Sequence, residues 1–228
     1  MCTSYEAPGQ MEFEAFSLSP KPSFEYRRET YKDYAAPIFR HIDGQLSTDA
    51  ATFGMIPRER IPPGVKVFDT MNARAETVGQ KRSFSGAWNR LQLALIPCHR
   101  FYEPSYETGK AVRWRIGLAD DSACAIAGLW RAWDNPDGSR GLSMTMLTVN
   151  ADEHPLMKRF HKPGVEKRGV VVLPQSEHVD WLSCRNTDEA RSFLRLLPAD
   201  ALKAEPYPLP PRVRTAPAPE EGDQPSLI

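Results

Sequence analysis

The chain has 228 residues, of which 41% are hydrophobic and 25% charged, and its 29 basic side chains balance 29 acidic ones. This composition is typical of a globular protein of one domain, and it excludes histone-like polycations and strongly acidic proteins. The sequence shows neither an apolar run close to the about 18–20 residues of a membrane span nor the N-terminal pattern of a secretory signal. We therefore expect a cytoplasmic location.

Six short apolar runs bounded by turn residues predict β-strands. Their residue ranges are 65–68, 91–96, 112–118, 125–130, 143–149 and 169–173. Residues 134–138, Asp-Asn-Pro-Asp-Gly, have the composition of a turn between two of these strands. The segment from residue 6 to residue 30 is polar and interrupted by proline, so we expect an irregular conformation there.

Three other stretches predict short helices, at residues 152–161, 176–184 and 187–197. The last has the clearest pattern, because Asn186 can cap it, Glu189 can complete a capping box and apolar residues follow at helical spacing. Pro198 is expected to end it. Because the predicted strands outnumber the helices, the pattern indicates an α+β fold dominated by β-structure, with short helices at its edges.

The last 24 residues differ in composition from the rest of the chain. Residues 205–228 contain 7 of the 21 prolines and few apolar side chains, too few to offset the entropy of ordering them. We therefore expect one domain at 1–204 and a disordered tail at 205–228. Gln224, Leu227 and Ile228 resemble the short peptides that bind the bacterial sliding clamp. The alternative is an arbitrary C-terminus without a partner.

The four cysteines are Cys2, Cys98, Cys124 and Cys184. No two of them have the C-x-x-C spacing, and no histidine pair has the spacing of a zinc site. The sequence also lacks a glycine-rich phosphate-binding motif. We expect free thiols and neither a metal nor a cofactor.

Cys2 has a distinct chemistry if Met1 is removed, because the same residue then carries a free α-amine and a thiol. The amine can attack an aldehyde to give a Schiff base, and the thiol can then close a five-membered thiazolidine ring. The α-amino pKa of about 7.7–8.0 leaves part of the amine nucleophilic near neutral pH. The alternative is that residue 2 has no role, because a single residue is a weak signal.

Three downstream segments carry side chains that suit this chemistry. An amide can position the amine, a carboxylate and an imidazole can transfer protons, and a guanidinium can hold a phosphate. The candidates are Asn72 and Arg74 after one strand, Glu103 at the end of another, and His161. Each also has a plain structural interpretation: Asn72 as a turn residue, Glu103 as a strand-end charge and His161 as a cation at a helix C-terminus.

At these residues the sequence resembles the SOS-response-associated peptidase (SRAP) family. Met1-Cys2, Asn72-Ala73-Arg74, Phe101-Tyr102-Glu103 and His161 stand in the family's order, and the match runs from Cys2 to about Pro174. The resemblance implies one domain with a barrel-like, mostly antiparallel sheet. It also implies a basic groove for single-stranded DNA and a covalent link between the N-terminal cysteine and abasic sites, which shields the lesion in the response to DNA damage.

The family's roles can be carried over residue by residue. The resemblance implies Cys2 as nucleophile, Asn72 as the group that holds the amine or the linked sugar, and Arg74 as a phosphate contact. It further implies Glu103 as the acid/base of imine formation and sugar-ring opening, with His161 as a second acid/base. A protein bound to DNA in this way would be associated with the nucleoid.

This sequence departs from the family's pattern around the expected DNA groove. Thr3-Ser4-Tyr5 replaces Gly-Arg-Phe, so that Ser4 offers only a weaker hydrogen bond. Phe53 stands where the family has tryptophan, and we expect it to stack on a base. Lys162 and Arg168 lie in a longer stretch after His161, where they either replace the missing phosphate contact or belong to a solvated loop.

Three functions therefore stay open. The first is a cross-linking enzyme for abasic sites in single-stranded DNA. The second is a thiol peptidase with a Cys2–His161 pair, whose main act would be autoproteolytic removal of Met1. The third is a non-catalytic module that binds single-stranded DNA and recruits the clamp through its tail. For each of them we expect a monomer.

Overall fold

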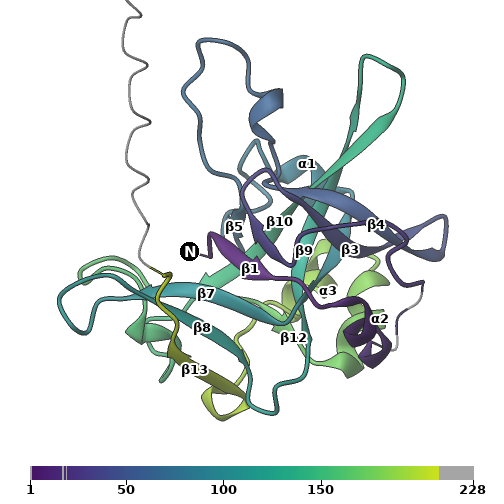
Figure 1. Ribbon diagram of the computed structural model, residues 1–228. Helices are drawn as coiled ribbons and strands as arrows, with labels where there is room; N and C mark the ends of the chain where they lie inside the picture. The colour runs from purple at the N-terminus through teal and green to yellow at the C-terminus, as the bar shows by residue number, and fades with distance from the viewer. Residues whose placement is uncertain (1, 17, 19, 211–228) are drawn as a thin grey trace, which may run out of the picture.

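The computed structural model describes residues 2–16, 18 and 20–210. Two sheets and a few short helices pack together in it (Figure 1). The expected α+β class with a barrel-like, mostly antiparallel sheet is confirmed, because five strands form a closed ring and most pairings are antiparallel. Within the described part of the chain, no helix is long and apolar enough to cross a membrane.

The closed barrel contains five strands that each pair with two neighbours. Its strand order is β10 (Arg140–Asn150), β4 (Gln45–Phe53), β3 (Ala35–Ile42), β6 (Leu93–Cys98) and β9 (Cys124–Asp134), which pairs again with β10. Among the pairings that close this ring, β4–β10 is the parallel one. Closure satisfies the backbone groups that an open edge would expose.

Three short strands extend the barrel close to its longest hairpin. β5 (Asn72–Arg74) pairs in parallel with β10, and β11 (Arg168–Val170) pairs with it in antiparallel fashion. β12 (Val172–Leu173) pairs with β9. In this way β10 joins residues 72–74 to residues 168–170, although almost a hundred positions separate them.

The second sheet is antiparallel and has five strands. Its strand order is β13 (Leu202–Pro206), β8 (Val112–Leu118), β7 (Arg100–Ser105), β1 (Ser4–Glu6) and β2 (Glu29–Tyr31). The N-terminal strand therefore lies inside the sheet, between β7 and β2. This position holds the beginning of the chain against β7.

Side chains of the barrel strands pack on both faces. In β6, Ala94 and Ile96 belong to a core cluster that also holds Tyr5 and Phe101 of the second sheet. The alternate residue Leu95 belongs to a second cluster, together with the buried aromatic residues of the helices. Because successive side chains of a strand point to opposite faces, one cluster joins the two sheets and the other joins the barrel to its helices.

In the part of the chain that the structure describes, three short α-helices and five 3-10 turns cover the sheets. The α-helices are α1 (Ser85–Asn89), α2 (His178–Leu182) and α3 (Thr187–Ser192). Trp88 of α1 and Trp181 of α2 are buried, and the indole N–H of Trp181 donates to the carbonyl of Ala94 at 2.9 Å. The 3-10 turns are η1 (Gln10–Ala15), η2 (Arg58–Arg60), η3 (Met157–Arg159), η4 (Gln175–Glu177) and η5 (Ala199–Ala201).

Several predicted elements are confirmed in place, though not in length. The strand predicted at 112–118 is β8, and the strands predicted at 91–96, 125–130 and 143–149 are the central parts of longer or slightly shifted strands. The predicted turn at 134–138 joins β9 to β10, with Gly138 at a φ of +81°. The run at 169–173 is divided into β11 and β12, because Val171 bonds across to Leu147 and Ala127 between them.

Other predictions were wrong. Residues 65–68 form no strand, and the helix predicted at 152–161 is reduced to η3. The helix predicted at 187–197 stops at Ser192, although Asn186 caps it as expected. Packing explains the early stop: Phe193 and Leu194 join the second core cluster, whereas Leu196 and Leu197 join the first. The stretch at 6–30, expected to be irregular, contains η1 and the first two residues of β2.

The predicted boundary after residue 204 falls inside a strand. Glu205 and Pro206 of β13 pair with β8, and the backbone N–H of Tyr207 donates to the carbonyl of Arg113 at 2.8 Å. These residues therefore belong to the second sheet rather than to a tail. The predicted clamp-binding residues Gln224, Leu227 and Ile228 lie outside the described residues.

Candidate active site at the N-terminus

The pairing of β1 with β7 determines where the N-terminus lies. Tyr5 stands opposite Phe101, and Glu6 stands opposite Arg100. Following this antiparallel register toward the start of the chain brings residue 3 level with residue 103. Cys2 consequently reaches the end of β7 that carries Glu103.

The Cys2 side chain is completely buried in the core cluster between the two sheets. Its thiol donates a hydrogen bond to the carbonyl of Ser4 at 3.2 Å. Burial, together with the nearby Glu103 charge, raises the pKa of this thiol to about 12. The thiol is therefore protonated at neutral pH, so that its attack on a substrate requires a partner that accepts its proton.

Asn72 holds the backbone of Cys2. Its position on β5 is set by pairing with Met146 of β10, and its side-chain amide N–H donates to the Cys2 carbonyl at 2.6 Å. The side-chain oxygen of Asn72 is buried and accepts no hydrogen bond from the described residues. It is therefore available for a donor next to Cys2, such as an amine or a sugar hydroxyl.

Glu103 is a buried carboxyl group with a strongly shifted pKa. Its side chain on β7 is 1% exposed, and loss of solvation raises its pKa from 4.5 to about 7. Both protonation states are consequently populated near neutral pH. A group with this property can donate a proton and take it back, as a general acid/base must.

Contacts of the His161 backbone and of the His161 ring hold this residue next to Glu103. It adopts a φ of +64°, which is uncommon for a residue with a side chain, and its backbone N–H donates to the carbonyl of Pro104 at 2.8 Å. The ring Nε2 lies 2.9 Å from the carbonyl of Arg168, and Nδ1 lies 3.4 Å from Oε2 of Glu103.

These contacts determine the protonation of the His161 ring. A carbonyl oxygen only accepts, so Nε2 carries the hydrogen, and loss of solvation lowers the pKa of the ring to about 4. His161 is therefore neutral near pH 7 and presents the Nδ1 lone pair to Glu103. The two side chains form a pair that can share one proton.

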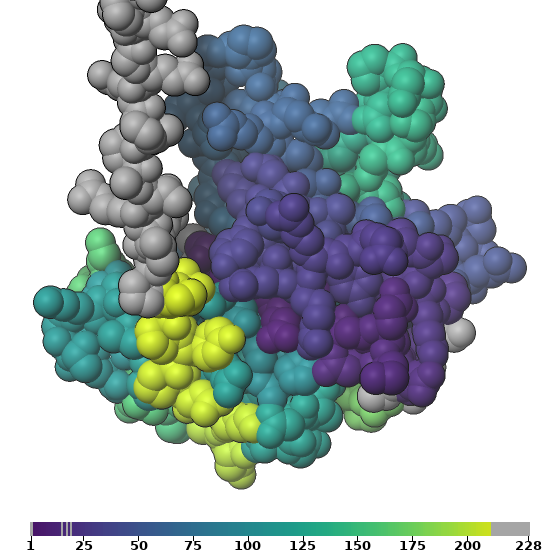
Figure 2. All heavy atoms as spheres, viewed as in Figure 1, coloured from purple at the N-terminus to yellow at the C-terminus, as the bar shows by residue number. Residues whose placement is uncertain are grey.

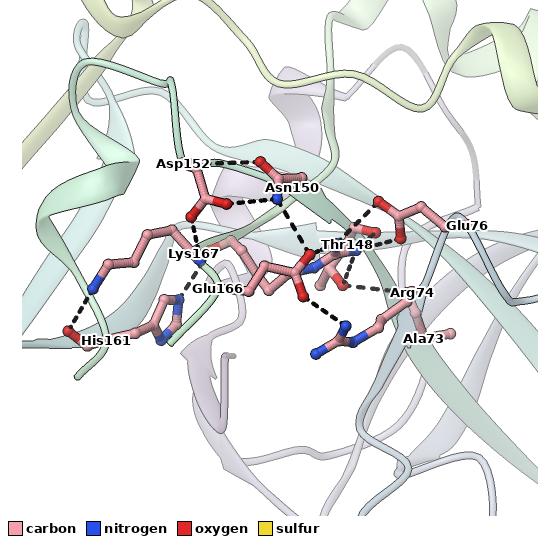
Figure 3. A network of polar contacts seen from close by, with 10 residues as sticks. Ala73, Arg74, Glu76, Thr148, Asn150, Asp152, His161, Glu166 and Lys167 are labelled. Carbon is pink, nitrogen blue, oxygen red and sulfur yellow. Dashed lines mark hydrogen bonds and ion pairs between the residues drawn. The ribbon is translucent and has the colours of Figure 1, made fainter. Parts of the chain in front are cut away.

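A network of charges lies beside His161 (Figure 3). Arg74 of β5 forms an ion pair with Glu166 at 2.6 Å, and its side chain is 48% exposed. Arg168 of β11 contacts Glu166 and Glu76, and it donates to the carbonyl of Thr148. Glu166 thus lies between an exposed guanidinium and a buried one.

The structure separates the predicted DNA contacts into exposed and buried residues. Arg74 and Lys162 are exposed. Arg168 is 2% exposed and surrounded by its partners, so a role as a replacement phosphate contact does not fit. Phe53 is completely buried edge-on against Tyr5, so base stacking does not fit either. Ser4 is buried within β1, but it borders a cavity beside Glu103.

A cavity of about 330 Å³ opens beside Glu103 and includes residues that the sequence did not reveal. Tyr31 could not be selected from the sequence because it stands in a charged segment without periodicity. Leu209 stands in the segment that was expected to be a tail. No motif distinguished Arg113 on β8. The cavity is lined by Thr3, Ser4, Tyr31, Tyr102, Glu103, Pro104, Ala111, Arg113 and Leu209.

Comparison with proteins of known sequence finds relatives of this chain. The chain is 32% identical over 152 residues to "Abasic site processing protein YoqW" of Bacillus subtilis (strain 168). It is also 32% identical over 152 residues to "Abasic site processing protein YobE" of the same organism. The match to YoqW covers 64% of this chain and 64% of YoqW, so it spans less than two thirds of that relative's length.

Solved structures show the same fold. A protein from Bordetella bronchiseptica is 35% identical and superposes with a TM-score of 0.81, covering 91% of this chain and 100% of that one. A protein from Bacteroides thetaiotaomicron shares the fold at 17% identity and a TM-score of 0.67, covering 90% and 91%. The model of the SOS response associated peptidase (SRAP) family matches residues 2–216. The chain therefore belongs to the SRAP family.

Proposed function

We propose that this protein recognises abasic sites in single-stranded DNA and forms a covalent cross-link through Cys2 once Met1 is removed. The single observation that carries the proposal is the position of Cys2. The amide of Asn72 holds the carbonyl of Cys2, and Cys2 lies beside the carboxyl group of Glu103, whose pKa is about 7. The names of the two Bacillus relatives, abasic site processing proteins, support the same substrate.

The proposed reaction forms one ring and releases one water molecule. The α-amine of Cys2 attacks C1′ of the opened deoxyribose to give a carbinolamine. Protonated Glu103 donates a proton to the departing hydroxyl group, which leaves as water, and an imine remains. The Cys2 sulfur then bonds to the imine carbon, and the proton of the thiol passes to nitrogen, which completes a thiazolidine.

The shifted pKa values suit this order of events. Because the Cys2 thiol stays protonated, the amine is the first nucleophile and the sulfur reacts only after the imine has formed. Glu103 is the acid that expels water, and as a carboxylate it can take a proton during opening of the sugar ring. Neutral His161 faces Glu103 through Nδ1, where it can hold the shared proton.

We assign the exposed cations next to the site to the DNA backbone. Arg74 stands on the same short strand as Asn72, and Lys162 follows His161 directly. Both can contact phosphates on either side of the lesion. Because few cations are involved and Arg74 already pairs with Glu166, we expect a shallow dependence of affinity on salt concentration.

The test is a cross-linking experiment with the mature protein. Its intact mass first establishes that one methionine has been lost. A single-stranded oligonucleotide with one abasic site should then give a shifted band on a denaturing gel, and Cys2→Ala should abolish it. Cys98→Ala is the matched control, because Cys98 is equally buried in the same cluster. Absence of a Cys2-dependent band would contradict the proposal.

The geometry favours cross-linking over general peptidase activity. A thiol peptidase needs a thiolate paired with an imidazole. Here burial keeps the Cys2 thiol protonated, and Nδ1 of His161 faces Glu103. Turnover of an unrelated peptide that is lost in Cys2→Ala would reverse this preference. Equal affinity for intact and abasic strands without a covalent product would instead indicate a non-catalytic DNA-binding module.

A further inference from the structure

The exposed aromatic side chains lie around the candidate active site. Within residues 2–16, 18 and 20–210, four phenylalanine, tyrosine or tryptophan side chains are exposed, by between 36% and 42%. We call these four the aromatic platform: Tyr31, Tyr34, Phe68 and Tyr207. Contiguous exposed apolar surface often marks an interaction site.

Contacts connect the platform to the cavity beside Glu103. Tyr31 lines this cavity, and its ring centroid lies 5.9 Å from that of Tyr34. Tyr207 stacks on Tyr102, another cavity residue, at 6.0 Å with an angle of 19° between the rings. The ammonium group of Lys32, the residue after Tyr31, donates a hydrogen bond to the backbone carbonyl of Phe68 at 2.9 Å. This bond holds the segment of Phe68 next to Tyr31.

The two ends of the described chain share one face of the molecule (Figure 2). In Figure 2 the yellow residues of β13 and its continuation lie on the same face as the purple N-terminal segments. The rings thus come from distant parts of the sequence. The second sheet links two of them: Tyr31 lies on β2, beside β1 at one edge, and Tyr207 follows β13, the opposite edge strand, which β7 and β8 separate from β1.

Guanidinium groups accompany the rings. Arg27 lies over Tyr34 at 5.2 Å from the ring centroid, and Arg115 lies over Tyr207 at 4.8 Å. Arg113 contacts Tyr102 at 3.4 Å. Aromatic rings interleaved with cations are the combination that binds single-stranded nucleic acid, because bases stack on the rings while phosphates approach the cations.

We propose that the aromatic platform stacks the unpaired bases that flank the abasic site. This inference rests on the proposed function and adds to it the surface that holds the intact nucleotides. Continuity with the Glu103 cavity and the accompanying cations favour a nucleic-acid strand over an apolar protein partner. Since every base has a flat π-face, the platform accepts any sequence next to the lesion.

Leucine variants of the platform test the inference, because they keep apolar volume but remove the ring. The variants are Tyr31→Leu, Tyr34→Leu and Tyr207→Leu, and Tyr34→Phe keeps the ring. Val179→Ala is the control for an exposed apolar side chain on α2, outside the platform. Melting curves of all variants establish that they fold.

The readout is the DNA concentration that gives half-maximal cross-linking. With a long abasic strand, each leucine variant should raise it at least about fivefold, because stacking contributes about 1–3 kcal/mol per base. The maximal rate should not change. Tyr34→Phe and Val179→Ala should match the wild type. An abasic trinucleotide, too short to span the platform, should distinguish the variants only weakly.

Two results would overturn the inference. One is an unchanged half-maximal concentration for all three leucine variants on the long strand. The other is an equal loss in Tyr34→Phe and Tyr34→Leu, because the hydroxyl rather than the ring would then matter. Failure of the proposed function would give a different result, because the wild type would then form no adduct. Fluorescence anisotropy with an intact labelled strand would still show whether the leucine variants bind single-stranded DNA more weakly than the wild type.

Discussion

The side-chain amide of Asn72 donates a hydrogen bond of 2.6 Å to the carbonyl oxygen of Cys2, across 70 positions of sequence. This bond joins β5, which extends the barrel, to Cys2, two residues before β1 of the second sheet. It fixes the backbone of the candidate nucleophile rather than its sulfur, so the direction of the α-amine depends on it. Mutation of Asn72 is therefore the first test of the site.

Replacing Asn72 by alanine should slow cross-linking without abolishing it. The variant loses the donor that orients Cys2 and leaves a buried carbonyl unsatisfied, a loss of about 1–3 kcal/mol, which corresponds to a rate roughly 5- to 150-fold lower. Single-turnover kinetics on an abasic oligonucleotide give the rate. Asn135→Ala, in the β9–β10 turn, is the control and should react like the wild type. Wild-type kinetics in Asn72→Ala would show that Asn72 is only structural.

The rate of cross-linking should fall as the pH rises above about 7. The proposed acid step needs protonated Glu103, whose pKa is about 7, while the amine needs to lose its proton at higher pH. The two requirements predict an optimum close to neutral pH. Glu103→Gln should be slower, and its rate should keep rising with pH until the amine is deprotonated. If the rate of Glu103→Gln also fell at high pH, that fall would have to come from the titration of another group.

Stability should also decrease between pH 6.5 and pH 8. The Glu103 pKa is higher in the folded protein than the about 4.3 of an unfolded chain, so its favourable contribution is full at low pH and disappears as pH rises through about 7. His161, whose pKa is lowered to about 4, acts in the opposite sense between about pH 4 and 6.5. The two effects oppose each other there, and of these two groups Glu103 alone acts above that range.

Urea unfolding at pH 6.5 and pH 8 measures this effect. The wild type should lose about 1 kcal/mol of unfolding free energy across the interval, and Glu103→Gln should lose much less, because it has no proton to release. An equal loss of unfolding free energy in the wild type and in Glu103→Gln would show that a group other than Glu103 titrates in this interval.

Glu166 should limit the affinity for DNA, because it pairs with Arg74. Glu166→Gln should bind single-stranded DNA several-fold more tightly at low salt. The slope of log affinity against log salt should steepen by up to about 0.7 for one added phosphate contact. Glu76→Gln is the matched control, since Glu76 pairs with Arg168, whereas Arg74 pairs with Glu166. An equal gain in both variants would indicate a general effect of net charge instead.

Some features of the fold followed directly from local sequence. The strand at 112–118 and the turn at 134–138 could be predicted because alternating or apolar residues and turn residues act over a few neighbours. The helix at 187–197 could not be predicted to its end. Its last four apolar residues are shared between two cores, and that division depends on strands far away in sequence.

The candidate site shows the same division. Cys2, Asn72, Glu103 and His161 could be selected from the sequence, because amine, thiol, amide, carboxyl and imidazole chemistry belongs to each residue itself. Their convergence is a result of strand pairing: β1 against β7, and β5 against β10. Arg168 and Phe53 were misjudged because charge and ring type say nothing about burial.

The sequence alone determined which functional groups the protein possesses and in what order they occur along the chain. Only the tertiary structure decided that Glu103 and Cys2 are desolvated, that Glu166 lies between Arg74 and Arg168, and that the exposed rings border the cavity. The physical reason is that desolvation and charge pairing depend on every group packed around a residue. Most of those groups come from strands that are distant in sequence.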